Sequence, residues 1–371
     1  MAKKTGRVKV GIIGCGNISS IYFHNMTNRF KDILEVTACA DLIHEKAAAQ
    51  GEKYGVPAVS VKELLADKEI EIVCNLTIPI AHASVGMAAL KAGKSVHNEK
   101  PLCITRTDGK KMLALAKKKR LLVGCAPDTF MGAGIQTCRK LIDDGVIGRP
   151  VSVNAFMMCH GHESWHPAPE FYYKVGGGPM FDMGPYYLTA LVNLLGAVKR
   201  VTGSARISFP TRTITSQPLY GKVVKVTTPT HISGVMDFAN GAVGTIITSF
   251  DVWNAQLPNI EIHGTKGSLE VPDPNGFGGT PKLFLPDDKG WREVPHTHGY
   301  AEEGRGIGVA DMARALRTKR INRPSGALAY HVLDIMHAFH DASKSGKHIT
   351  LRSGVPRPKP MPRNLKFGQL D

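Results

Sequence analysis

Short apolar runs alternate with amphipathic segments over the first third of the chain. The runs are rich in β-branched residues and have the length of buried strands, and segments with helical spacing lie between them. A helix between two strands returns the chain for a second parallel strand, and such crossovers are nearly always right-handed. The pattern predicts an α/β fold with a doubly wound parallel sheet. The predicted strands are 8–13, 34–40, 70–76, 95–97 and 121–125, and the predicted helices are 45–54, 83–92 and 108–119.

The pattern changes after residue 125. A helical segment at 134–144 precedes an alternating strand at 151–159, and a further helix is predicted at 181–195. Asn240 and Gly241 form a hairpin turn signal between two strands. This region predicts an α+β domain on a mostly antiparallel open sheet with helices on one face. Its other predicted elements are the strands 198–208, 221–228, 231–238, 243–250 and 260–263 and the helices 309–316 and 327–344.

The length of 371 residues favours two domains. We expect the doubly wound domain to occupy residues 1–127 and the α+β domain to occupy 128–350. Residues 351–371 contain four prolines and no periodicity, so they are expected to form an extended arm.

Composition narrows the class of protein. The chain is 43% hydrophobic and 21% charged, which is typical of a globular protein. Its net charge of 47 − 31 = +16 is spread over separate runs without aromatic residues between them, which favours solvated faces over nucleic-acid binding. There is no run of about 18 apolar residues and no signal-peptide pattern, so we expect a cytoplasmic protein without a membrane partner. The seven cysteines form no C-x-x-C pair and predict reduced, mostly buried thiols.

A glycine motif, GCGNIS, lies where the first predicted strand ends and a helix begins. Gly14 suits the tight turn, and Gly16 permits a pyrophosphate to approach backbone N–H groups at the helix N-terminus. Asn17 and Ile18 belong to the same expected cofactor-binding turn, and Ser19 occupies the third position of the motif. The motif alone is weak, because an incidental glycine turn in an α/β sheet would have the same letters.

Asp41 strengthens the prediction because it ends the second predicted strand, at about the spacing expected of the dinucleotide-binding fingerprint. A carboxylate at this position accepts hydrogen bonds from both ribose hydroxyls and repels a 2′-phosphate. No arginine follows immediately to bind such a phosphate, so NAD is expected in preference to NADP.

Two further loops end predicted strands and therefore converge on the ligand crevice of a doubly wound sheet. The first contains Thr77, Pro79 and His82, and the second contains Glu99 and Lys100. All five are expected to contact the cofactor. The alternative for the second loop is a solvated Lys–Glu pair before a turn.

A third motif, GGGPMFDMGPYY, opens the predicted helix 181–195. Asp182 and Tyr186 are spaced i, i+4 and share one helix face. A charge at a helix N-terminus beside a core tyrosine is the alternative explanation.

Together these motifs resemble the Gfo/Idh/MocA oxidoreductases over residues 8–345, through GIIGCGNIS, TIPIAH, EKP and GGGPMFDMGPYY. The resemblance implies a Rossmann domain and an α+β domain whose open sheet forms homo-oligomer contacts. It also implies hydride transfer between a nicotinamide and a secondary alcohol, with Lys100 contacting the reacting hydroxyl. Tyr186 stands where many members have the general-base histidine, and Thr189 replaces a second aspartate. A tyrosine at this place is also similar to glucose-fructose oxidoreductase.

Alcohol oxidation requires a base and a cation at the same oxygen while the hydride leaves toward the nicotinamide. A tyrosine has an ordinary pKa near 10, so it needs a nearby positive charge to act as the base at neutral pH. Our hypothesis is therefore an acid/base pair of Lys100 and Tyr186, steadied by Asp182, with all three residues contacting the substrate.

The segment 159–166 is rich in imidazoles. Its spacing matches no standard zinc site, so we expect no metal and predict a substrate wall instead, although zinc ligation is the alternative. Tyr172 and Tyr173 either extend the wall or pack in the core. The loop residues expected to bind substrate are His160, His162, Trp165 and His166.

The sequence therefore predicts an NAD-dependent oxidoreductase for a polyhydroxylated small molecule: a sugar, a cyclitol or a glycoside. The aromatic loop favours a substituted sugar ring that is oxidised to a keto-glycoside. Two alternatives stay open. One is a sugar–sugar oxidoreductase that keeps its nicotinamide bound, and the other is a nucleotide-sensing regulator without turnover.

Overall fold

The computed structural model describes residues 6–371, which form two compact units. The first unit contains the described chain up to Ala133, together with Thr297–Tyr330 and Pro358–Asp371. The second unit contains Gly134–His296 and His331–Arg357. The expected domain boundaries at residues 127 and 350 stay predictions.

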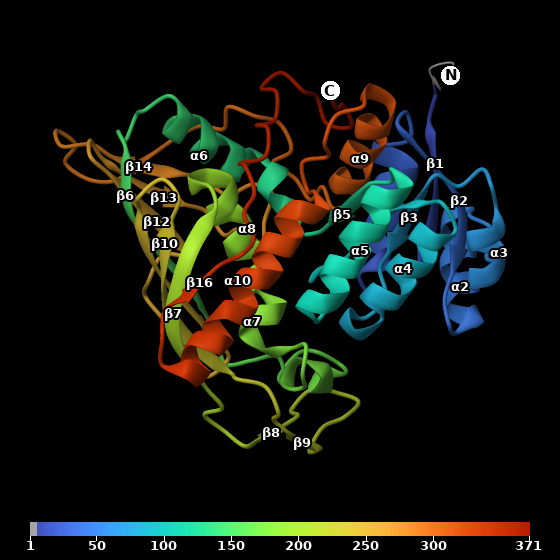
Figure 1. The fold of residues 1–371 in the computed structure, drawn as a ribbon, viewed down its shortest axis with the longest axis horizontal. Coiled ribbons are helices and arrows are strands. Elements are labelled where there is room, and N and C mark those ends of the chain that lie inside the picture. Colours follow the sequence, from blue (N-terminus) through green and yellow to red (C-terminus); the bar gives the residue numbers. More distant parts are fainter. Residues whose placement is uncertain (1–5) are drawn as a thin grey trace. The chain divides into compact units, whose positions relative to one another are not determined.

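The first unit contains a five-stranded sheet whose strands are all parallel, as predicted (Figure 1). The central strands are buried on both faces, which explains their continuous apolar sequences. In sheet order the strands are β2 (Leu34–Ala40), β1 (Val8–Ile13), β3 (Ile72–Asn75), β4 (Ser95–Asn98) and β5 (Val123–Cys125).

Local signals set the ends of the helices in this unit. Ser60 and Glu63 form a capping box, Thr105 accepts a hydrogen bond from the backbone of Asp108, and Gly55 ends a helix with φ 67°. The helical elements are α1 (Ser19–His24), η1 (Asn25–Arg29), α2 (His44–Tyr54), α3 (Val61–Ala66), η2 (Pro79–Ala81), α4 (His82–Lys91), α5 (Arg106–Lys119), η3 (Thr129–Met131) and α9 (Ile307–Thr318).

The second unit is built on a nine-stranded sheet in which every neighbouring pair is antiparallel except β6 and β11, so the predicted mostly antiparallel sheet is confirmed. In sheet order the strands are β15 (Arg292–Glu293), β14 (Lys282–Phe284), β13 (Ser268–Val271), β12 (Ile260–Gly264), β6 (Pro150–Met158), β11 (Val243–Ser249), β10 (His231–Phe238), β7 (Val198–Arg206) and β16 (Ile349–Thr350).

Helices cover one face of this sheet (Figure 1). Along β10 the residues alternate between buried and half-buried, and the buried set faces the helices. Phe339 packs against Gly234, where a Cβ would lie 2.4 Å from its ring and collide with it. The helices are α6 (Ala133–Asp143), η4 (Pro169–Tyr173), α7 (Gly178–Asp182), α8 (Gly184–Leu195) and most of α10 (Gly326–Ser345).

The structure corrects the predicted helix 181–195, which is divided in two at Met183. Pro185 has no backbone N–H, so it cannot donate to the carbonyl four residues earlier, and the helical hydrogen bonding is interrupted there. Asp182 therefore ends α7, and Tyr186 lies in the first turn of α8.

Short elements account for most of the other differences. The predicted strand 221–228 is reduced to β9 (Val223–Lys225), which pairs with an unpredicted β8 (Thr211–Thr213) in a separate hairpin. The strands from β13 to β16 were not predicted either, because two to four residues carry too little alternation to be recognised. The last residues, 351–371, form no helix or strand, and the extended arm expected there stays a prediction.

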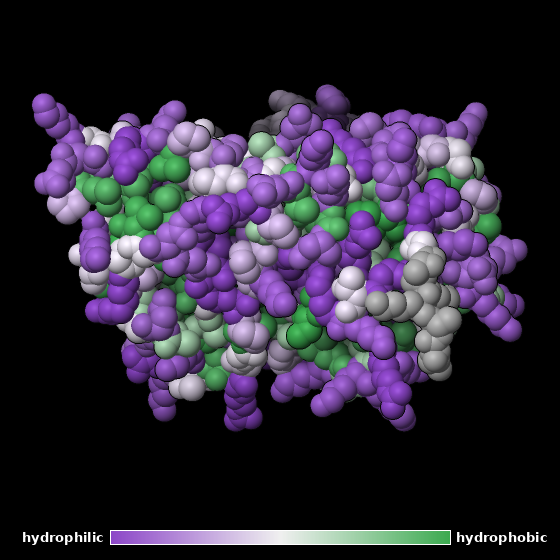
Figure 2. Space-filling view, turned by 90° about the horizontal axis from the view of Figure 1, so that it is seen from above, coloured by the Kyte–Doolittle hydropathy of each residue, from purple (hydrophilic) through white to green (hydrophobic). Residues whose placement is uncertain are grey.

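Polar and charged side chains dominate the face in Figure 2, with smaller apolar patches between them. Six of the seven cysteines are buried and Cys159 is half-buried; all seven are free thiols, as predicted. Among residues 6–371, no helix combines the length and the apolar character needed to cross a membrane.

Candidate functional site

The carboxyl edge of the parallel sheet brings four predicted loops together within the first unit. The strand order reverses at β1, which has β2 on one side and β3 on the other, and ligands of doubly wound folds bind at such a point. The loops after β1, β2, β3 and β4 contain all ten residues that were predicted to bind the cofactor.

The two glycines of the first loop have different surroundings. Gly14 has φ +102°, and a Cβ there would lie 2.6 Å from the backbone carbon of Leu76, so no other residue fits. Gly16 is exposed, and a Cβ there would meet nothing within 4 Å. The first glycine therefore closes the turn, while the second leaves open backbone for a phosphate to approach at the start of α1.

Asp41 is fixed by the backbone of the neighbouring loops. Its Oδ2 accepts a hydrogen bond from the backbone N–H of Cys15 at 2.7 Å, and its Oδ1 accepts one from Ile43 at 2.9 Å. A carboxylate oxygen can accept more than one hydrogen bond, so the group retains capacity for ribose hydroxyls.

Exposed apolar side chains surround this edge, which the motif argument did not foresee. Leu42 is 98% exposed, and Ile18, Ile43, Ile78 and Ile80 are also exposed. They belong to the loops after β1, β2 and β3, and apolar side chains of this kind line most nucleotide pockets.

His82 holds the third and fourth loops together. Its Nε2 lies 2.8 Å from the carbonyl oxygen of Thr77, and its Nδ1 lies 2.6 Å from that of Pro101. Burial lowers the pKa of His82. Because the ring is fully buried and both nitrogens contact the protein, it positions the Lys100 loop.

Glu99 and Lys100 do not form the solvated pair that was the alternative explanation. Glu99 is buried, and its carboxylate accepts hydrogen bonds from the Tyr22 hydroxyl at 2.7 Å and from the backbone N–H of Lys100 at 2.8 Å. Lys100 is half-buried. The glutamate thus fixes the backbone from which the lysine side chain extends.

In the second unit, the loop after β6 meets the end of α7. His162 Nε2 lies 3.0 Å from Asp182 Oδ2, and the two side chains are only 11% and 12% exposed. The sequence had singled out both residues but had not paired them. Tyr186 is buried in α8.

Aromatic rings enclose the His162 imidazole. The rings of Trp165, Tyr172 and Phe250 lie edge-on to it, with centroids 5.1, 4.3 and 4.6 Å away. Tyr172 therefore lies beside the loop that was predicted to line the substrate site, whereas Tyr173 is fully buried and packs in the core.

A buried ion network holds the loop, and no pattern in the sequence indicated it. Arg212, from β8, donates to Glu163 at 2.8 Å and also to Asp251. Glu163 in turn accepts a hydrogen bond from the Tyr173 hydroxyl, next to the backbone N–H of His162. Only side chains far apart in sequence make this network, so spacing could not reveal it.

A pair of stacked rings lies beside the network. The rings of His160 and Trp253 are 3.4 Å apart between centroids and nearly parallel, and Trp253 is 82% exposed. Arg212 approaches His160 Nε2 at 3.5 Å, and burial together with that charge lowers the pKa of His160. Within residues 6–371, no three His, Cys, Asp or Glu side chains are arranged to hold a metal ion.

Comparison with known proteins shows which family this chain resembles. Residues 8–126 match the model of the oxidoreductase family with an NAD-binding Rossmann fold, and residues 135–270 match the GFO/IDH/MocA C-terminal domain. The chain belongs to the GFO/IDH/MocA family. This membership confirms the resemblance that the motifs carried, the fold class, and NAD as the cofactor that the first unit's fold binds.

Two relatives are named as inositol dehydrogenases. Inositol 2-dehydrogenase of Salmonella typhimurium is 31% identical over 169 residues, which are 44% of this chain and 48% of that protein. The chain thus spans about half the length of this relative. Myo-inositol 2-dehydrogenase of Thermotoga maritima is 22% identical over 85% of this chain and 90% of that protein.

Solved structures share the fold over nearly the whole chain. Levoglucosan dehydrogenase in complex with NADH has a TM-score of 0.81 at 23% identity and covers 94% of this chain and 100% of that one. Aldose-aldose oxidoreductase from Caulobacter crescentus has a TM-score of 0.74 at 21% identity and covers 93% and 100%. At these identities the likeness establishes the fold alone.

Proposed function

We propose that this protein is an NAD-dependent oxidoreductase that transfers a hydride between the nicotinamide and a secondary hydroxyl of a polyhydroxylated ring, either a sugar or a cyclitol. The observation that carries the proposal is the loop edge of the first unit, where an open Gly16 backbone lies beside the anchored Asp41 carboxylate. Family membership and the polyol-dehydrogenase relatives support the same reaction.

The residues fit NAD in two ways. The exposed Gly16 backbone suits the pyrophosphate, and the Asp41 carboxylate suits the adenosine ribose while it repels a 2′-phosphate. We therefore expect NAD to bind more tightly than NADP.

The catalytic residues proposed from the sequence are Lys100, Asp182 and Tyr186. Bound NAD would supply the hydride acceptor. The Lys100 ammonium would contact the reacting hydroxyl and stabilise negative charge that develops on its oxygen, while Glu99 keeps the lysine backbone in place. Asp182 would orient a neighbouring group that handles the proton.

The substrate ring is proposed to carry a substituent, with oxidation at a ring hydroxyl to a keto-glycoside. Support comes from the second unit, where Trp165, Phe171 and Trp253 are exposed around the His162 loop. Exposed rings offer flat apolar faces to a sugar or an aglycone.

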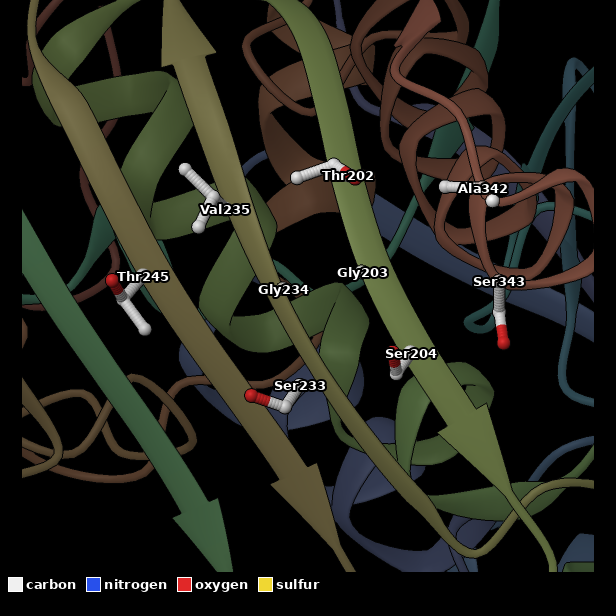
Figure 3. Close-up of a pocket in the computed structure, with 10 residues that line it drawn as sticks. Thr202, Gly203, Ser204, Ser233, Gly234, Val235, Thr245, Ala342 and Ser343 are labelled. Carbon is white, nitrogen blue, oxygen red and sulfur yellow. The ribbon is translucent and has the colours of Figure 1, made fainter.

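A homo-oligomer is proposed through the uncovered face of the nine-stranded sheet. A hollow of about 430 Å³ opens among small hydroxyl and aliphatic side chains there and at the edge of β7, and none of its lining residues belongs to the predicted site (Figure 3). A charge in the middle of this face, as in Val235→Glu, should convert the oligomer to monomers in light scattering. The lining residues are Thr202, Gly203, Ser204, Ser233, Gly234, Val235, Thr245, Ala342, Ser343 and Gly346.

The proposed function is tested with a panel of cyclitols, free sugars and glycosides, each supplied with NAD or NADP. We expect absorbance of reduced nicotinamide to appear with at least one polyol and with NAD preferred. If exchange between two sugars occurs without NADH release, the cofactor stays bound between half-reactions. If NAD binds but no polyol reacts, and the protein shows salt-sensitive binding to nucleic acid, the regulator is favoured instead.

A further inference from the structure

Three imidazoles in the loop after β6 differ in which ring nitrogen is already used. His160 Nε2 faces the Arg212 guanidinium, which can only donate, so Nε2 accepts and Nδ1 carries the proton. His166 Nδ1 accepts from the backbone N–H of Ala168 at 3.0 Å, so its Nε2 carries the proton. In their neutral forms, the one ring lone pair of each therefore already accepts a hydrogen bond from the protein.

His162 has the opposite arrangement. Its Nε2 faces the Asp182 carboxylate at 3.0 Å, and an ionised carboxylate can only accept, so Nε2 carries the proton. The neutral ring therefore keeps a lone pair on Nδ1, and no hydrogen bond to Nδ1 occurs among residues 6–371. Of the three imidazoles, only this one leaves its unprotonated ring nitrogen without a hydrogen-bond donor among the described residues.

We propose that His162 is the general base of the alcohol oxidation and that Asp182 is its positioning residue. The inference rests on the proposed function and assigns the proton acceptor within it. It assigns to His162 the role that the sequence gave to Tyr186, because the Asp182 carboxylate is hydrogen-bonded to the His162 imidazole.

The surroundings hold His162 in one orientation. Trp165, Tyr172 and Phe250 pack edge-on around the ring, and the Tyr173 hydroxyl lies 3.3 Å from the backbone N–H of His162, which donates to it. The ring is 11% exposed, so it is shielded from bulk water but still reachable. A carboxylate behind an imidazole fixes its tautomer and stabilises the imidazolium that proton transfer creates.

The hydroxyl O–H bond breaks and its proton joins Nδ1 of His162, while the C–H bond breaks. Bound NAD would supply the acceptor for the hydrogen that leaves the carbon with both electrons. A C=O bond forms, giving a ketone and reduced cofactor. The imidazolium keeps its Nε2–H bond to Asp182 and later releases the Nδ1 proton to solvent.

The test compares His162→Gln, Tyr186→Phe and His263→Gln with a polyol that the wild type oxidises. His263 is the matched control, since it is a half-buried histidine of the same unit, 3.7 Å from the Glu261 carboxylate, on β12. We expect kcat to fall about 10²–10⁴-fold in His162→Gln and to stay near wild type in His263→Gln. Tyr186→Phe should fall far less than His162→Gln, with NAD affinity unchanged in all three variants.

Two further readouts separate proton transfer from loss of structure. Added imidazole should restore part of kcat to His162→Gly and none to Tyr186→Phe. In the protein without cofactor, nitrogen NMR should show His162 as the Nε2–H tautomer, and Asp182→Asn should change that signal.

Four results would be decisive. Wild-type kcat in His162→Gln, or an Nδ1–H tautomer for His162, overturns the inference but leaves the oxidoreductase intact. A large loss in Tyr186→Phe without one in His162→Gln returns the base to tyrosine. A wild type that oxidises no polyol contradicts the proposed function itself.

Discussion

The carboxyl edge of the five-stranded sheet and the loop after β6 both gather polar side chains, but different contacts hold them. At the sheet edge, the hydrogen bonds come from backbone N–H groups. Cys15 N–H donates to the Asp41 carboxylate, and Lys100 N–H donates to the Glu99 carboxylate. In the loop, the guanidinium of Arg212 binds Glu163, and the carboxylate of Asp182 binds His162. A short motif can therefore specify the first region, whereas the second depends on side chains distributed over the chain.

The largest expected effect comes from removing the Lys100 ammonium at the carboxyl edge of the five-stranded sheet. Lys100→Met should lower kcat about 10²–10⁴-fold, because charge on the reacting oxygen then goes unstabilised. NAD affinity, measured by calorimetry, should change little. Lys110→Met, an exposed lysine of α5, is the matched control and should behave like wild type. Equal kcat in the two variants would remove Lys100 from the chemistry.

The buried ion network of the second unit should depend on one residue, Arg212. Arg212→Met leaves the carboxylates of Glu163 and Asp251 buried without their cation, which costs about 3–5 kcal/mol of the free energy of unfolding. Lys222→Met removes an exposed pair with Glu170 and should cost less than about 1 kcal/mol. Urea denaturation of both variants makes the comparison, and similar losses would show that the network does not hold the loop.

A buried histidine of the first unit, His97, should make the free energy of unfolding fall at acid pH. Both ring nitrogens of His97 are buried without a hydrogen-bond partner among the described residues, and burial lowers its pKa to about 3. The unfolded chain binds the proton near pH 6.5, so this stabilising contribution is present above pH 6.5 and is lost as the pH falls toward the folded value. Between pH 6.5 and 4.5 the wild type should lose roughly 2–3 kcal/mol more than His97→Leu. Parallel stability curves for the two proteins would contradict this.

The two glycines of the motif should separate stability from cofactor binding. Gly14→Ala forces a side chain into a left-handed turn against Leu76 and should cost about 1–3 kcal/mol of folding free energy. Gly16→Ala meets no neighbour, so its melting temperature should stay near wild type. Its NAD affinity should fall about tenfold, or ~1.4 kcal/mol, because the methyl group occupies the approach of the pyrophosphate. Reversed effects in calorimetry would mean that the roles of the two glycines are exchanged.

The two regions also differ in how far the sequence predicts them. The parallel sheet, its glycine turn and Asp41 follow from periodicity and spacing, because each depends on neighbours within a few dozen residues. The His162–Asp182 pair and the Arg212 network do not follow, since each joins a loop to a residue whose place depends on the tertiary fold. The division of the predicted helix at Met183 was within reach, because Pro185 is visible in the sequence.

In the proposed reaction, the substrate polyol transfers its carbon-bound hydrogen to NAD as a hydride. The most direct measurement supplies a polyol deuterated at its ring carbons together with NAD and weighs the dinucleotide by mass spectrometry after turnover. We expect reduced nicotinamide that is one deuterium heavier, with a matching ketone. Ketone formed while the dinucleotide stays free of deuterium would contradict it.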